Sequence, residues 1–171
     1  MIALETTRER MLADIGASAA VLSTSSPDPT GAELVAAEQA RLLVKRNAPE
    51  ELLPSLNSFL ERRFADIPPE RLHRDVLSPL KKAVGNAHKR GNLRQNDKWI
   101  TVEVVVTRTG AFLEISDEGN GFDVLATLAR FRAGEEYFAH SGSGFRRYTK
   151  ARSLVSFDRG GSTLRLRFLR G

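Results

Sequence analysis

Alternating hydrophobic and polar positions predict strands in the second half of the chain. Residues 100–106 alternate in this way, and after a Thr-Gly turn at 109–110 residues 111–116 form the second strand of a predicted hairpin. Two further strands are predicted at 154–157 and 162–169. In the last strand apolar side chains share one face and arginines share the other, so we expect a sheet with one covered and one solvated face.

Hydrophobic residues at three- and four-residue steps predict helices around these strands. Residues 41–46 are expected to form a first strand, followed by a helix that begins at the N-cap Asn47 and ends near Phe64. Two shorter helices are predicted at 124–132 and 145–153. This order of elements predicts an α/β (α+β) two-layer sandwich, in which a mixed sheet is covered on one face by helices.

The longest helical pattern runs from Leu72 to Gly91. We expect Gly91 to end this helix in a left-handed turn. Pro79 lies inside the pattern and lacks a backbone N–H, so it predicts either a kink or a new helical segment capped by the hydroxyl of Ser78.

The start of the chain differs in composition from the rest. Residues 7–15 predict one short helix, and residues 22–31 are rich in turn formers and poor in apolar side chains. We interpret residues 1–37 as an N-terminal extension or linker that forms a flexible arm, and residues 38–171 as one domain. A chain of 171 residues with 41% hydrophobic content is long enough to bury one core.

Composition excludes several classes of protein. There are no cysteines and only three histidines, so disulfides, thiolate chemistry and a zinc site made by the protein alone are not expected. No apolar run is long enough to cross a membrane, and charges near the start exclude a signal peptide. We therefore predict a cytoplasmic protein without a membrane partner.

The charge balance points to anionic partners. The net charge is +5 and the pI is near 10, and basic residues cluster in segments 81–94, 146–152 and 165–170. Such clusters release counterions from nucleic-acid phosphates, but no nucleic-acid module is recognised, so nucleic-acid binding is the less favoured interpretation.

Candidate chemistry begins on the long predicted helix. Lys82, Asn86 and Arg90 lie four residues apart and therefore share one stripe, opposite the apolar row. Gly85 and Asn86 are poor helix formers, each costing up to about 1 kcal/mol relative to alanine. This cost favours a functional reason for their presence.

Three glycine-containing segments follow in order. Asp117 ends a predicted strand and is followed by Gly119 and Gly121, which permit a tight turn. A second segment contains Gly142 and Gly144 immediately before a predicted helix, whose N-terminal amides are suited to bind an anion. Thr163 stands two residues after Gly161, at the start of the last strand.

Together these four segments resemble the N-box, G1 box, G2 box and closing Gly-x-Thr of the GHKL (Bergerat-fold) ATPases. The resemblance is strongest to the small anti-sigma-factor serine kinases and related histidine-kinase-like ATPase domains, and it covers about residues 38–170. It implies that ATP and Mg²⁺ are cofactors, that Asn86 helps to hold Mg²⁺, and that Asp117 accepts a hydrogen bond from the adenine amino group. The remaining implied nucleotide-binding residues are Gly119, Gly121, Gly142, Gly144 and Thr163.

One position departs from the family pattern. Four residues before Asn86, where the family has its catalytic glutamate, this chain has Lys82. An ammonium donates hydrogen bonds but accepts none, so it does not replace a carboxylate that activates a nucleophile. Asp75 and Glu70, which lie one or more turns earlier in the chain, are the alternative carboxylates. We therefore expect nucleotide binding with slow or absent kinase or ATPase turnover.

The resemblance implies a regulatory protein that controls a partner such as a sigma factor, an anti-sigma antagonist or a response regulator. The main alternative is a protein-binding module of the same fold that needs no nucleotide. A histidine phosphotransferase centred on His73 is least favoured, because Pro79 lies one residue too far from it for the phosphoacceptor pattern. Whether the protein forms a homodimer stays open at this point.

Overall fold

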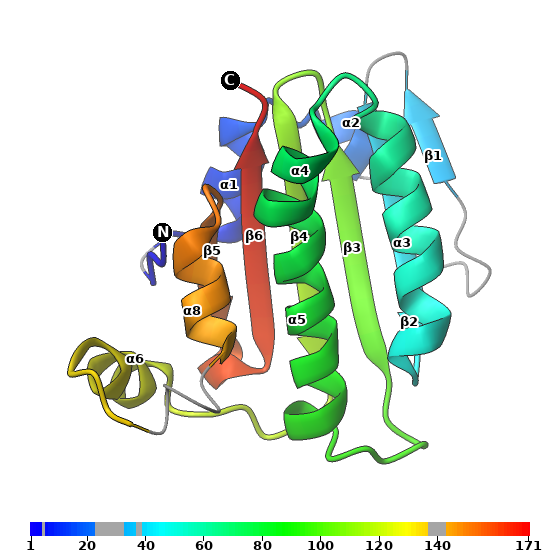
Figure 1. Cartoon of the computed structure of the whole chain (residues 1–171). Coiled ribbons are helices and arrows are strands. Elements are labelled where there is room, and N and C mark those ends of the chain that lie inside the picture. The colour runs from blue at the N-terminus through cyan, green and yellow to red at the C-terminus, as the bar shows by residue number, and fades with distance from the viewer. Residues whose placement is uncertain (5, 23–32, 37–38, 137–142) are drawn as a thin grey trace.

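The structure is a computed structural model that describes residues 1–4, 6–22, 33–36, 39–136 and 143–171. In this part of the chain six strands form one sheet in the order β1-β2-β3-β4-β6-β5, and helices lie on both faces of it (Figure 1). The strands are β1 Glu33–Ala36, β2 Gln39–Arg46, β3 Ile100–Val106, β4 Gly110–Asp117, β5 Leu154–Asp158 and β6 Thr163–Leu169. The helical elements are α1 Arg8–Asp14, α2 Ala19–Leu22, α3 Pro49–Arg63, α4 Pro69–Leu72, η1 His73–Leu77, α5 Ser78–Asn86, η2 Ala87–Gly91, α6 Val124–Arg132, α8 Ser143–Lys150 and η3 Arg159–Gly161.

The α+β class is confirmed, but the predicted mixed sheet is wrong. Every pair of neighbouring strands is antiparallel. The reason lies in the connection from β2 to β3, which consists of two helical rods, α3 and α4–η2, that run in opposite directions (Figure 1). Two antiparallel rods return the chain to the end of the sheet at which β2 stops, so that β3 runs antiparallel to β2. A single crossover helix would instead give parallel strands.

The main core lies between the sheet and α3, α5 and α8. The inward faces of β3 and β6 contribute Val102, Val104 and Leu166, all fully buried, and α3 and α5 contribute the leucines and phenylalanine that the helical spacing predicts. The hairpin of β3 and β4 pairs residue for residue, from Ile100 opposite Asp117 to Val106 opposite Ala111. In the described residues, no helix has both the length and the apolar character needed to span a membrane.

The opposite face of the sheet is covered as well, which corrects the prediction of one solvated face. Helix α1 begins after Thr7, whose side chain accepts a hydrogen bond from the Arg10 amide. Its Met11 and Leu12 pack with Phe112 of β4 in a second hydrophobic cluster. The prediction of a flexible arm is therefore wrong for residues 6–22, because α1 and α2 bury apolar side chains against the sheet. Residues 23–31 of the predicted turn-rich stretch lie outside the described residues.

Three local predictions at helix ends are also wrong. Asn47 is not the N-cap of α3: the N-cap is Ala48, and the Asn47 side chain donates to the carbonyl of Asn96. Gly91 is not left-handed; the positive φ angles after the long helix belong to Leu93 (52°) and Arg94 (60°). Ser78 makes no capping hydrogen bond, and its hydroxyl accepts one from Arg147 instead.

Candidate functional site

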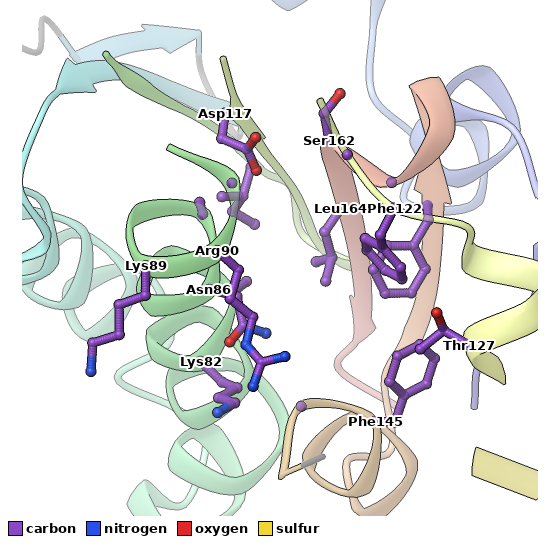
Figure 2. A pocket seen from close by; sticks show the side chains of 18 of the residues that line it. Lys82, Asn86, Lys89, Arg90, Asp117, Phe122, Thr127, Phe145, Ser162 and Leu164 are labelled. Atoms are coloured by element: carbon purple, nitrogen blue, oxygen red, sulfur yellow. The ribbon is translucent and has the colours of Figure 1, made fainter. Parts of the chain in front are cut away.

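One cavity of about 520 Å³ gathers most of the predicted site residues. It lies between the end of the long helix, the loop after β4, the start of α8 and the turn between β5 and β6 (Figure 2). We call it the main cavity. Ile115 and Leu164, on adjacent strands β4 and β6, form its floor. Its volume falls in the range of about 300–1,000 Å³ that is usual for small-molecule sites.

The predicted stripe of the long helix faces this cavity. Lys82, Asn86 and Arg90 follow one another along α5 and η2, and their side chains line the same wall (Figure 2). The helix continues without a break through Pro79, because the chain passes through a π-helical turn, η1, before Pro79 occupies the first turn of α5. In the first turn of a helical segment the missing N–H of proline costs little.

Asp117 lies at the other end of the main cavity from Lys82 (Figure 2). The carboxylate fits there because residue 91 is glycine: a Cβ at Gly91 would lie 2.2 Å from Asp117 Cγ. Gly119 packs equally tightly, since its Cβ would lie 2.1 Å from the Gly91 carbonyl oxygen. The amide of Gly119 donates to Asp117 Oδ1 over 2.9 Å.

Burial raises the pKa of the Asp117 carboxyl above its ordinary value, because a charged group is less stable away from water. The hydrogen bond from the Gly119 amide and the positive charge of Lys98 act in the opposite direction and reduce the shift. A partly desolvated carboxylate with one oxygen already bonded is suited to accept one more hydrogen bond from a ligand.

Asn92 holds this end of the site together, and the sequence analysis assigned it no role. It is fully buried; its Nδ2 donates to the Trp99 carbonyl at 2.9 Å, and its Oδ1 accepts from the Glu118 amide at 2.9 Å. Asn92 therefore ties the end of the long helix to the residue after Asp117. Asparagine is a common turn residue, and the position of Asn92 directly after Gly91 is the only feature of the sequence that indicates this structural role.

The loop after Asp117 packs against the turn that precedes β6. Gly121 has a φ of 70° and its Cβ would lie 2.3 Å from the Gly160 carbonyl oxygen, so only glycine fits there without strain. The Phe122 amide donates to the same Gly160 carbonyl at 2.7 Å. These contacts place Phe122 over the cavity, where its ring meets Phe157 edge to face at 5.6 Å.

An aromatic wall faces the polar helix across the main cavity. Phe145 of α8 stacks on Phe157 of β5 at 5.8 Å and meets Phe122 edge to face at 6.5 Å. Tyr148, one turn after Phe145, packs against Phe157 at 6.3 Å. Aromatic faces of this kind bind a planar ring by stacking.

The start of α8 meets the helix stripe directly. A Cβ at Gly144 would lie 3.1 Å from Asn86 Nδ2 and 3.7 Å from Lys82 Cε. The Tyr148 hydroxyl is buried at the cavity wall and has no hydrogen-bond partner of good geometry among the described residues. Burial raises the pKa of this phenol, and the nearby Asn86 side chain opposes the shift only in part.

Charge is separated along the main cavity. Of the described residues that line it, Lys82, Lys89, Arg90 and Arg130 are cationic and only Asp117 carries a carboxylate. Arg130, on α6, also pairs with the exposed Glu135 at 2.8 Å. The cavity thus has one end that accepts hydrogen bonds and a larger cationic region, which favours an anion with a hydrogen-bond-donating ring.

Two predicted site residues, Gly119 and Thr163, do not line the main cavity, and a third, Gly142, lies outside the described residues. Gly119 lies behind Asp117 against Gly91, and the side chain of Thr163 is buried and hydrogen-bonded to Ser116 at 3.0 Å. The resemblance also implies an ATP lid at residues 131–141 with Gly134 as its hinge, and residues 137–141 of this segment lie outside the described residues. Gly134, expected as the lid hinge, has a φ of 75°.

The alternative carboxylates on the long helix lie elsewhere. Asp75 is fully buried and accepts hydrogen bonds from the side chain of Arg74 and the amide of Arg152, and Glu70 is exposed. Neither residue lines the main cavity. Over the described part of the chain, no cluster of three or more histidine or acidic side chains is arranged to hold a metal ion.

The arginines of the last strand are largely used in ion pairs. Arg165 pairs with Glu114 and Asp158 at 2.6 Å each, and Arg167 pairs with Asp14 of α1. This basic cluster therefore stabilises the second face of the sheet and gives little support to a nucleic-acid surface.

Comparison with known proteins assigns no family to this chain. No protein-family model matches the sequence, and no curated protein matches it.

Proposed function

We propose that this protein binds an adenine nucleotide in the main cavity and acts as a regulatory protein of the GHKL type, like the anti-sigma-factor serine kinases. One observation carries the proposal. Lys82, Asn86, Asp117, Gly121 and Gly144, which lie in three separate segments of the sequence, all line one cavity.

ATP suits the chemistry of the cavity walls. Oδ2 of Asp117 would accept a hydrogen bond from the adenine amino group, and the aromatic wall would contact the planar base. The cationic side chains and the amides at the start of α8 would hold the phosphates. The buried hydroxyl of Tyr148 is a further donor at the same wall.

Turnover is expected to be slow or absent. A kinase or ATPase of this type needs a carboxylate beside the terminal phosphate to orient the attacking group. In the described residues, the only cavity-lining carboxylate, Asp117, is assigned to the base and lies away from Lys82 (Figure 2). Asp75 is bonded to Arg74 and Arg152, so it is unable to take that role.

A nucleotide that binds without being consumed acts through conformational coupling. Binding at the main cavity would favour one arrangement of α6, which contributes Thr127 and Arg130 to the wall and carries the exposed Leu125. Coupling of this kind changes the affinity for a second ligand at another site. The second ligand would be a protein partner such as a sigma factor, an anti-sigma antagonist or a response regulator.

Equilibrium titration with a fluorescent ATP analogue tests the proposal. We expect saturable binding that unlabelled ATP reverses, with weaker competition by GTP, because guanine presents a carbonyl oxygen to Asp117 where adenine presents an amino group. Absence of saturable binding at millimolar nucleotide would reject the proposal and leave the nucleotide-independent protein-binding module.

Replacing the lysine at the position of the family glutamate should create turnover. In Lys82→Glu a carboxylate would stand one helical turn before Asn86, where it can orient a water molecule. We expect phosphate release to rise by about 100-fold or more above that of the unchanged protein in the presence of Mg²⁺. Lys82→Gln, which removes the charge without adding a base, is the control and should stay inactive. If Lys82→Glu binds ATP but releases no phosphate, the geometry assigned to this helix position is wrong.

A further inference from the structure

The phosphate end of the main cavity is built from hydrogen-bond donors and cations. Lys82 and Arg90 contribute positive charge, and Asn86 presents its Nδ2 toward the start of α8, 3.1 Å from the place of a Gly144 Cβ. The first amides of α8 and the hydroxyl of Tyr148 are also donors. Groups of these kinds are suited to bind phosphate oxygens directly.

The same end is poor in groups that bind a divalent cation. Mg²⁺ is usually held by one or two carboxylates together with phosphates and water. Among the described residues at this end, the only side-chain oxygen acceptor on the helix stripe is the Asn86 amide oxygen, and the half-buried Lys82 lies one turn away. An ammonium in that position repels a divalent cation. The magnesium site that the resemblance implies for Asn86 therefore does not fit these residues.

We propose that the site binds the nucleotide triphosphate as its metal-free anion, with Lys82 supplying the positive charge that Mg²⁺ would otherwise provide. This inference rests on the proposed nucleotide binding. It adds that the ligand class is the free polyphosphate anion, and that Lys82 is a determinant of this preference.

Two observations on the position of Lys82 support the inference. Lys82 Cε lies 3.7 Å from the position that a Cβ at Gly144 would occupy, so the end of the lysine side chain lies beside the start of α8. Figure 2 shows Lys82 in line with Asn86 and Arg90, and away from Asp117. The cation and the helix N-terminus thus act on the same part of a ligand, opposite the base end.

Binding of ATP to the full chain with and without metal tests the inference. Affinity is measured by calorimetry in excess EDTA and again in excess Mg²⁺. We expect the dissociation constant in EDTA to be equal to or lower than that in Mg²⁺. Binding that is at least tenfold tighter with Mg²⁺ would overturn the inference while leaving the proposed function standing, whereas no binding under either condition overturns both.

Two lysine variants give the matched comparison. Lys82→Met should lower the affinity for metal-free ATP by about 10- to 100-fold, the usual loss when a charged hydrogen bond is removed, and Mg²⁺ should then tighten binding. Lys81→Met removes a neighbouring exposed lysine that does not line the cavity and should bind like the unchanged protein. Equal loss in both variants would show a general charge effect and would overturn the assignment to Lys82. Circular dichroism checks that both variants are folded.

Discussion

Asp117→Asn is expected to lower the affinity for ATP by about 100-fold or more without unfolding the protein. The carboxylate has two acceptor oxygens, and Oδ1 is already bonded to the Gly119 amide. An amide has only one acceptor oxygen and a donating nitrogen. In the variant, either the Gly119 N–H or the adenine amino group would therefore face another donor. The measurement is titration with the fluorescent ATP analogue, with circular dichroism and thermal unfolding to check the fold.

Glu118→Gln is the matched control for this prediction. Glu118 is the next residue and is exposed. Outside the main cavity, its carboxylate accepts a hydrogen bond from the Trp99 amide and forms an ion pair with Lys45. The change from carboxylate to amide is the same, but it leaves one acceptor for the Trp99 amide, so ATP affinity should change less than about threefold. An Asp117→Asn protein with unaltered affinity would refute the assignment of Asp117 to the base.

Asp75→Ala is expected to lower the free energy of unfolding by about 3 kcal/mol. Asp75 is fully buried in η1, and its carboxylate accepts hydrogen bonds from Arg74 at 2.8 Å and from the Arg152 amide at 3.0 Å. Its removal leaves the Arg152 amide without an acceptor at the turn between α8 and β5. The measurement is the urea midpoint at neutral pH, and ATP affinity of the folded fraction should be unchanged.

This loss should depend on pH. Burial alone would raise the pKa of Asp75, but hydrogen bonds from Arg74 and the Arg152 amide, with the nearby positive charges, outweigh it and hold the pKa below the ordinary 3.8. The carboxylate therefore stabilises the fold above pH 3.8, and the contribution disappears as the pH falls through the lower folded value. The difference between the unchanged protein and Asp75→Ala should be largest at neutral pH and shrink in acid.

Glu70→Ala provides the comparison for Asp75. Glu70 lies on the preceding helical turn but is exposed, so its removal should change stability by less than about 0.5 kcal/mol. Equal destabilisation by the two variants would argue against a specific structural role of Asp75. A loss of ATP affinity in folded Asp75→Ala would restore it as a candidate for the missing carboxylate.

The positions of the strands and helices could be predicted because each carries its own hydrophobic period. The hairpin of β3 and β4, the last strand and the helices α3 and α6 begin and end within a few residues of the predicted limits. The sheet direction could not be predicted in the same way. It depends on whether the helical segments between β2 and β3 form two antiparallel rods, and the sequence left open whether Pro79 kinks the second rod or starts a new segment.

The fate of the N-terminal segment depended on long-range contacts. The helix at α1 could be predicted from its own residues, but its partners Val105 and Phe112 stand about 100 residues later in the chain. Their apolar side chains on the supposedly solvated face were the available sign in the sequence. Arg165 and Arg167, read as solvated, instead face the acidic groups that pair with them.

The sequence by itself determined which residues of the site are special: a helix stripe of Lys82, Asn86 and Arg90, and glycines where side chains would collide. Local pattern is enough for this, because helical periodicity and glycine requirements act over a few residues. Only the tertiary structure decided that these segments share one cavity, that Tyr148 belongs to its wall while Asn92 braces the loop after Asp117, and that Asp75 lies elsewhere. Burial, backbone collision and charge separation arise between segments far apart in the chain, so they exist only once the sheet has brought those segments together.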